Sequence, residues 1–254
     1  MQKFSIIIPT YNQPRLAKRA IRSVMQQDTD DWEIIVSDDS ENDDIRHMAE
    51  SLQESRLRYL RHEPGETAAD NWNHGLQAAE GKYLILMHHD EAFEEPTHLA
   101  QTARAFEAGA EVVVSDIRIC AGGKTSTGRP DWLKRLTLRH PAWLMLCNTI
   151  GPTACIAFRR EQLQLVDNRL SWIVDAEWYY RLLKGRNTVF LKSLSILSEH
   201  GHQGQISRRL DVEQAYRRDK AVIDETYRAQ ADVRRMTALY GQWIIRTKKL
   251  LGKL

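Results

Sequence analysis

The sequence predicts an α/β protein with a mostly parallel central sheet flanked by helices, and two observations support this. Over residues 1–116, short apolar runs rich in β-branched residues alternate with longer stretches whose apolar residues recur at helical spacing. Such apolar runs are typical of strands buried on both faces, and strands that alternate with helices of this length form βαβ units. A chain of 254 residues, 42% of them hydrophobic, can build one such domain with a short appendage.

The elements of this first part follow from the pattern in order. The expected strands are the apolar runs at 4–9, 33–37, 57–60, 83–87 and 112–115. The expected helices lie between them, at 14–27, 43–52, 67–79 and 96–107. In the first helix, Pro14 suits the first turn, and apolar residues such as Leu16 and Ile21 recur at helical spacing. Gly81 is expected to end the third helix.

The pattern changes in the second part of the chain. Gly122 and Gly123 predict the turn of a hairpin at 117–124. The other expected elements are a helical stretch at 131–147, a turn feeding a strand at 151–158, a short helix at 175–183, short strands at 189–191 and 194–197, and two long helices within 210–251. We therefore expect a main domain, 1–207, with halves of about 1–116 and 117–207, and a basic helical C-terminal extension, 208–254.

Charge is distributed unevenly along the chain. The net charge of +2 argues for nothing by itself, and we expect no nucleic-acid partner. From Arg208 onward, twelve Lys or Arg face six Asp or Glu, so this segment carries +6 and the remainder −4. The tail at 239–254 mixes Trp, Ile and Leu with lysines, which fits an interfacial helix on an anionic membrane. A solvated helix, or one docked on the domain or on a second subunit, is an open alternative.

Composition also sets an expected location. No apolar run reaches the roughly 18 residues of a spanning helix. The first strand begins at Phe4, which leaves no room for a signal peptide. Cys120, Cys147 and Cys155 lack metal-ligand spacing and are expected to be free thiols in a reducing compartment. We expect a cytoplasmic protein, with the inner face of the membrane as a further location because of the basic tail.

Polar clusters follow several of the expected strands. They are Thr10-Tyr11-Asn12, Asp38-Asp39-Ser40, His88-His89-Asp90-Glu91 and Asp116. In an open parallel sheet, ligands bind beyond the carboxyl ends of the strands. A single acidic residue in such a place can be a helix cap or a solvated turn. Four clusters at four strand ends predict a binding site at one edge of the sheet.

The first strand end excludes a dinucleotide cofactor. Residues 9–14 contain no glycine, and the chain has no P-loop, so no backbone cradle for a pyrophosphate is expected. A cation would have to hold the pyrophosphate in place of such a backbone cradle. The carboxylates and imidazoles after the fourth strand suit Mn²⁺, or Mg²⁺ with more retained waters.

Taken together, these motifs resemble those of glycosyltransferase family 2, whose members are inverting enzymes with a GT-A fold. The matching stretches are 5–12, 33–40, 73–75, 78–83, 88–91, 151–153, 158–160, 175–182 and 202–207. They occur in order and at plausible spacings over residues 4–207. The segment 88–91 is similar to the family's metal-binding DXD motif, and 175–182 to the segment with its catalytic base.

The resemblance implies roles for individual residues. The implied catalytic base is Asp175, with Glu177 as a weaker candidate. The implied donor-binding residues are Pro9, Thr10, Tyr11, Asp38, Asp39, Asn73, His89 and Asp90. The implied metal ligands are Asp90 and His202, with His88 and Glu91 as further candidates. The implied acceptor-side residues are Gly151, Thr153 and Trp178.

Two of these assignments have alternatives. His88 stands where the DXD motif has its first Asp, so His88 and His89 either ligate a metal or simply end a strand. Asp175 begins a helix, where the dipole keeps a carboxylate ionised, and it is either a general base or an ordinary N-terminal helix charge. The tryptophans of the second half form either an acceptor platform or core packing. These are Trp132, Trp143, Trp172 and Trp178.

The resemblance implies transfer of a sugar from a nucleoside diphosphate donor, expected to be UDP-linked, to a saccharide or lipid-linked saccharide. A role in bacterial surface polysaccharide synthesis is expected. The alternative is a non-catalytic nucleotide- or carbohydrate-binding relative, because the DXD motif is altered. A nucleotidyltransferase is disfavoured, since the chain lacks a Gly-rich loop and an activating lysine near the first strand.

Overall fold

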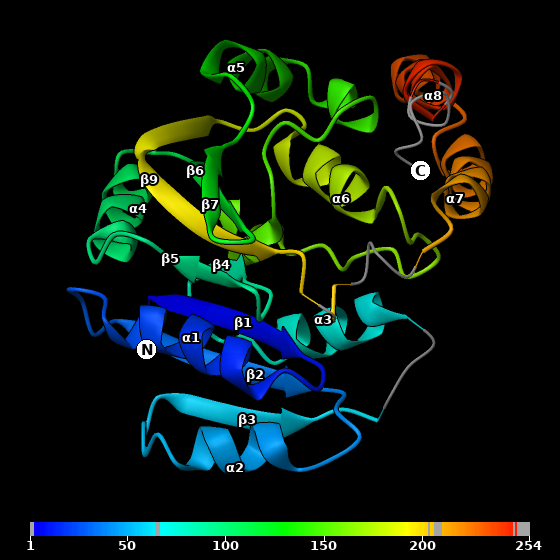
Figure 1. The fold of residues 1–254 in the computed structure, drawn as a ribbon. Helices are drawn as coiled ribbons and strands as arrows, with labels where there is room; N and C mark the ends of the chain where they lie inside the picture. Colours follow the sequence, from blue (N-terminus) through cyan, green and yellow to red (C-terminus); the bar gives the residue numbers. More distant parts are fainter. Residues whose placement is uncertain (1–2, 64–66, 203, 206–209, 246, 248–254) are drawn as a thin grey trace.

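The computed structural model describes residues 3–63, 67–202, 204–205, 210–245 and 247. Its centre is one sheet of nine strands (Figure 1). In spatial order these are β3 (Leu57–Arg61), β2 (Trp32–Asp38), β1 (Phe4–Thr10), β4 (Tyr83–Leu86), β8 (Ile156–Arg159), β6 (Val112–Ala121), β9 (Thr188–His200) and β5 (Glu91–Phe93), with β7 (Lys124–Thr127) paired to β6. The fold is the expected α/β class.

The first four strands of this order are parallel, as predicted. Every residue of β1 and of β2 is buried, which explains why isoleucine and valine fill the centre of both strands. Their register pairs Phe4 with Trp32 and Thr10 with Asp38, so both strands end at the same level. Consequently the loops after β1 and β2 begin side by side.

The second half of the sheet is mixed. β8 runs antiparallel to both β4 and β6, and β5 runs antiparallel to β9, whereas β6 and β9 are parallel. Residues 189–191 and 194–197, expected as two strands, belong to the single strand β9, which pairs with β6 across an irregularity at Ser115 and Asp116. β5 was not predicted, because this three-residue strand begins within the polar cluster after β4, at Glu91.

Helices flank this sheet (Figure 1). They are α1 (Pro14–Met25), α2 (Asp44–Glu50), α3 (Ala68–Gln77), α4 (His98–Glu107), α5 (Asp131–Arg139), α6 (Val174–Leu183), α7 (Val212–Thr226) and α8 (Ala231–Leu239). α3 packs closely on β1: a Cβ atom added at Gly75 would lie 2.5 Å from Cγ2 of Ile7. The expected helix at 131–147 ends at Arg139 and continues as a 3-10 turn, Pro141–Met145, because Pro141 lacks the amide hydrogen that a longer helix requires.

The C-terminal extension forms α7 and α8, followed by a π-helical turn at Tyr240–Ile245. Figure 1 shows α7 and α8 on the same side of the molecule as α6. The expected boundary at residue 207 and most of the basic end of the tail lie outside the described residues. Within the described part of the chain, every helix is too short or too polar to cross a lipid bilayer.

Candidate functional site

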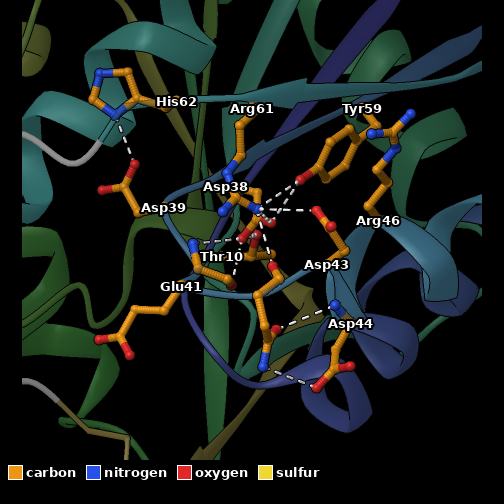
Figure 2. Close-up of polar contacts among 12 residues, drawn as sticks. Thr10, Asp38, Asp39, Glu41, Asp43, Asp44, Arg46, Tyr59, Arg61 and His62 are labelled. Atoms are coloured by element: carbon orange, nitrogen blue, oxygen red, sulfur yellow. Dashed lines mark hydrogen bonds and ion pairs between the residues drawn. The ribbon is translucent and has the colours of Figure 1, made fainter.

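The ends of β1 and β2 are joined through one buried carboxylate. Asp38 is fully buried, and its Oδ1 accepts hydrogen bonds from Oγ1 of Thr10 at 3.0 Å and from the backbone N of Ser40 at 3.0 Å. Its Oδ2 accepts a hydrogen bond from the hydroxyl of Tyr59 at 2.8 Å, as Figure 2 shows. The protein's own donors therefore occupy both oxygens, and Asp38 shapes the strand ends.

The neighbouring carboxylate, Asp39, points elsewhere. In Figure 2 it faces His62 rather than the group around Asp38, and its Oδ1 lies 2.6 Å from Nδ1 of His62. Burial raises the pKa of Asp39, although the contact with His62 opposes this shift. His62 itself follows β3 directly. It was missed by sequence reasoning, although the rule used for the other strands, a polar residue just after an apolar run, would have found it.

The loops after β1 and β2 are cross-linked. The backbone N of Asn12 donates to Oγ of Ser40 at 2.8 Å, and the backbone N of Glu41 donates to Oδ1 of Asn12 at 3.2 Å. Asn12 has a φ of +51°, a conformation that asparagine tolerates better than most residues. The Tyr11 hydroxyl donates to Oε1 of Glu41 at 2.8 Å, and 39% of Tyr11 is exposed.

The cluster after β4 contains potential metal ligands. His88, Asp90 and Glu91 each offer a ligand atom, and these atoms lie within 4.8 Å of one another. Nε2 of His202 lies 3.0 Å from Oδ2 of Asp90, so the loop after β9 reaches the same place. Burial alone raises the pKa of Asp90, but His88, His89 and His202 outweigh it and hold this pKa below its usual range.

Glu91 has a structural position within this cluster. Its buried carboxylate accepts hydrogen bonds from the backbone N of His88 at 3.2 Å and of Ala154 at 3.0 Å, and lies 3.2 Å from Nδ1 of His88. Burial opposes charge on His88, but the carboxylates around it raise its pKa to about 9. Nδ1 of His202 and Nε2 of His88 are buried and have no hydrogen-bond partner among the described residues.

His89 differs from His88. Burial lowers the pKa of His89 to about 4, and its ring is hydrogen-bonded to the backbone of Pro9, which is buried at the end of β1. The neutral ring of His89 thus links β4 to β1. Both histidines end the strand, and His88 also lies against the carboxylates of the cluster, so the two alternatives stated for this pair are compatible.

Helix α6 brings Asp175 to the same place. Asp175 is the second residue of α6, and its Oδ1 is buried without a hydrogen-bond partner among the described residues. Burial raises its pKa, and the nearby charge of His88 opposes this shift. Glu177, the weaker candidate, is held by Arg181 at 2.7 Å and by the hydroxyl of Tyr227, both of which belong to the interior. Asp175 is therefore the carboxylate of this helix that is free to accept a proton.

The three residues expected on the acceptor side differ in their contacts and burial. The carbonyl oxygen of Gly151 accepts a hydrogen bond from the Tyr179 hydroxyl at 3.1 Å, and Gly151 has a φ of +114°. Thr153 is fully buried, and its hydroxyl has no partner among the described residues. Of the two alternatives for Trp178, its surroundings are those of core packing: it is 1% exposed and its indole N–H donates to the backbone of Gln164 at 2.8 Å. A side chain without an exposed face cannot stack on a sugar.

Other expected residues are engaged elsewhere. Both amide atoms of Asn73 pair with the backbone of Val166, at 2.9 and 2.8 Å, which joins α3 to the segment before α6. Asp116 lies 2.8 Å from Nζ of the fully buried Lys134. Neither contact leaves these side chains directed at the cluster. Of the remaining tryptophans, Trp132 is 68% exposed and Trp143 is 38% exposed.

Arg19 was also missed. On α1, its Nη2 donates to the backbone oxygen of Asp90 at 2.9 Å, and its Nη1 pairs with Glu199 near the end of β9. The backbone N of Glu199 donates to the same oxygen of Asp90 at 2.9 Å. Nothing in the sequence distinguishes Arg19 from the other basic residues of α1, because its partners come from two segments that lie far away in the chain.

The chain was compared with known proteins. The family model described as "Glycosyl transferase family 2" matches residues 5–165. A curated relative, the GalNAc(5)-diNAcBac-PP-undecaprenol beta-1,3-glucosyltransferase of Campylobacter jejuni, is 36% identical over 94 residues, which cover 36% of this chain and 30% of the relative. Another, the Escherichia coli UDP-Glc:alpha-D-GlcNAc-diphosphoundecaprenol beta-1,3-glucosyltransferase WfgD, is 32% identical over 87 residues and 34% of each chain. The chain thus spans about a third of the length of these relatives.

Solved structures show the same fold. S. aureus TarS 1-349 in complex with UDP-GlcNAc aligns with a TM-score of 0.70 and 18% identity, over 98% of this chain and 73% of TarS. The mannosyltransferase PcManGT from Pyrobaculum calidifontis, in complex with GDP-Man and Mn²⁺, aligns with a TM-score of 0.64 and 17% identity, over 99% of this chain and 81% of the mannosyltransferase. The architecture is the GT-A fold, as the sequence predicted.

Proposed function

We propose, from the premise that this chain belongs to glycosyl transferase family 2, that it transfers a sugar from a nucleoside diphosphate donor to a saccharide hydroxyl, with inversion at the anomeric carbon. One observation carries the proposal. Asp175 has a buried carboxylate oxygen without a partner among the described residues, close enough to His88 for their charges to interact, and His88 belongs to the cluster with Asp90. A potential general base and a diphosphate-binding cluster therefore face one another.

The nucleotide would bind at the ends of β1 and β2. Asp39 would accept the N3–H of uracil, most strongly as the ionised carboxylate, and His62 would hold that carboxylate in place at 2.6 Å. The half-exposed ring of Tyr11 would lie against the base, while Asp38 and Thr10 keep the two loops in register. The names of relatives and of a structural neighbour, which include UDP-Glc and UDP-GlcNAc, favour a uridine donor.

The donor diphosphate would lie at Asp90. The carboxylate of Asp90 and the imidazoles of His202 and His88 form a donor set suited to Mn²⁺ or Mg²⁺, and the two unpartnered ring nitrogens fit such a site. A divalent cation bound there would supply positive charge to the leaving diphosphate. Asp90 and His202 would hold it, and Glu91 would fix the loop through its bonds to His88 and Ala154.

Asp175 would act as the base. An acceptor hydroxyl attacks the anomeric carbon as the bond to the diphosphate breaks, and Oδ1 of Asp175 takes the hydroxyl proton. Burial raises the pKa of Asp175, which makes its carboxylate a stronger proton acceptor than an exposed one. On the acceptor side, the backbone turn at Gly151 would orient the sugar, and the buried Thr153 would support that segment.

The acceptor is proposed to be a lipid-linked saccharide used for bacterial surface polysaccharides. Two relatives are named for undecaprenol-diphosphate acceptors, which supports this class. A protein that acts on such a lipid meets the membrane at its inner face, so we propose a cytoplasmic protein in peripheral contact with that face. The basic C-terminal tail would contribute to the contact through its lysines.

The alternative is a non-catalytic relative with the same fold, and one assay separates the two. Purified protein is incubated with Mn²⁺, UDP-glucose or UDP-N-acetylglucosamine, and a short-chain polyprenyl diphosphate carrying N-acetylglucosamine. The proposal predicts UDP release coupled to a disaccharide lipid, and EDTA abolishes both. Nucleotide binding without any UDP release, from either donor and in water as well as with the acceptor, would support the non-catalytic alternative.

A further inference from the structure

A buried carboxylate on α7 has no place in the mechanism above. Asp219 is fully buried, and it accepts hydrogen bonds from three consecutive backbone N–H groups: Ser171 at 3.1 Å, Trp172 at 2.7 Å and Ile173 at 2.9 Å. The hydroxyl of Ser171 donates a fourth hydrogen bond at 3.2 Å. These donors belong to a segment almost fifty positions earlier in the chain, so the contact is one between the extension and the main domain.

The bonded segment is the entry to α6. Ile173 is the N-cap residue of α6, and Asp175 is the second residue of the helix. The N-cap residue has no side-chain hydrogen bond of its own. Asp219 accepts hydrogen bonds from the backbone N–H of this residue and of the two residues before it, so its last bonded amide lies only two residues before Asp175.

The hydrogen bonds between Asp219 and the amides of residues 171–173 are strong because the carboxylate is buried. An unpaired charge in the interior is costly, whereas hydrogen bonds from several amides to an ionised carboxylate are roughly twice as strong as neutral ones. In the part of the chain that the structure describes, Asp219 forms no ion pair with Lys or Arg. Its charge is therefore balanced by the amides that lead into α6, and α6 cannot shift without breaking these bonds.

Other contacts of the extension reach the same helix. The hydroxyl of Tyr227 donates to Oε1 of Glu177, and the rings of Tyr180 and Tyr227 meet edge to face with centroids 5.4 Å apart. The indole N–H of Trp172 donates to the hydroxyl of Tyr240 at 2.7 Å. α7 and the turn after α8 thus hold the first two turns of α6 and its entry.

We propose that Asp219 is a positioning residue that fixes the place of Asp175, so that the C-terminal extension is a working part of the active site. The inference rests on the proposed function for its catalytic consequence, and on the contacts above for the anchoring itself. General-base catalysis depends on the distance between the base and the hydroxyl, and misplacement by about 1 Å can cost on the order of 100-fold in rate.

The test uses Asp219→Asn, which keeps the size of the side chain but removes the charge and one acceptor. Tyr216→Phe is the matched control, because it removes a 2.8 Å hydrogen bond to the backbone of Thr237 within the extension and keeps the ring that packs against Tyr240. Both proteins are assayed for hydrolysis of UDP-glucose with Mn²⁺, for UDP affinity by calorimetry, and for backbone amide hydrogen exchange over residues 171–177.

For Asp219→Asn we expect kcat to fall about 10- to 100-fold, with KM and UDP affinity unchanged and with faster exchange at 171–177. Tyr216→Phe should leave all three readings near those of the unaltered protein. Normal kcat in Asp219→Asn, or an equal loss in the control, would overturn the proposal. If Asp219→Asn does not fold, Asp219→Glu retains the carboxylate with a longer reach and should keep more kcat than Asp219→Ala.

Failure of the proposed function gives a different result. In that case the unaltered protein hydrolyses neither UDP-glucose nor UDP-N-acetylglucosamine, and the catalytic part of this inference fails with it. The exchange measurement still decides the anchoring: slow exchange at 171–177 in the unaltered protein and fast exchange in Asp219→Asn support it. Equal exchange in the two proteins would contradict it.

Discussion

Oδ2 of Asp90 lies 3.0 Å from Nε2 of His202, a residue 112 positions later in the chain. The contact joins the end of β4 to the loop after β9, and it sets the side of the site where a donor diphosphate would bind. A carboxylate and an imidazole at this distance can be bridged by one cation, and the prediction for Asp90 below depends on this.

Replacement of Asp90 should abolish the effect of metal on nucleotide binding. We expect Asp90→Asn to lower the affinity for UDP in Mn²⁺ by about 10- to 100-fold, as the loss of a metal-supporting group commonly does. In EDTA the variant and the unaltered protein should bind UDP equally weakly. Calorimetric titration measures both conditions. Equal affinity for UDP in Mn²⁺ would contradict the assignment of Asp90.

The affinity for UDP should depend on the protonation of Asp39. Burial raises the pKa of this carboxyl group, and its ionised form accepts the N3–H of uracil more strongly than its protonated form does. Affinity is therefore complete above that raised pKa and falls as the pH drops through it. Asp39→Asn should bind UDP more weakly at neutral pH and lose this dependence.

The variant is also the control for this experiment, because protonation of the UDP phosphates affects both proteins alike. The ratio of the two affinities should approach one at low pH. A ratio that stays constant from pH 8 to pH 4, while circular dichroism shows both proteins folded, would remove Asp39 from the base-binding site.

Asp38 should contribute more to the free energy of unfolding than the exposed Asp44 does. Four different side chains and one backbone amide donate to it, and it is fully buried. We expect Asp38→Ala to lower the free energy of unfolding by about 3 kcal/mol, because it leaves several buried donors unpaired. Asp44→Ala, at an exposed position on α2, should change it by less than about 0.5 kcal/mol. Urea denaturation measures both, and similar losses would contradict the role given to Asp38.

Much of the site could be predicted because parallel strands bring their ends together. Thr10, Asp38 and Asp90 each directly follow or end an apolar run, so their place at one edge depended only on the recognition of the strands. The same rule could not place Asp175, because Asp175 lies on α6 and not at the end of a parallel strand. The element between β4 and α6 is β8, which runs antiparallel to β4. Its placement was expected from the resemblance to the family.

The remaining features depend on tertiary contacts that carry no local signal. Trp178 is a residue type that can stack on a sugar, but its indole packs edge to face against Phe158, with the ring centroids 5.6 Å apart. Only the folded chain reveals this contact. Asn73 was expected at the donor, yet its partner is the backbone of Val166, 93 positions away. The same holds for Asp219, whose three amide partners lie in another part of the chain.

The central claim is that Asp175 is the catalytic base, and Asp175→Asn tests it most directly. The variant keeps the shape of the side chain but cannot take a proton. We expect turnover of UDP-glucose, with water or with the lipid-linked acceptor, to fall by about 100- to 10,000-fold, while UDP affinity in Mn²⁺ is unchanged. Normal turnover in a folded Asp175→Asn protein would contradict the account.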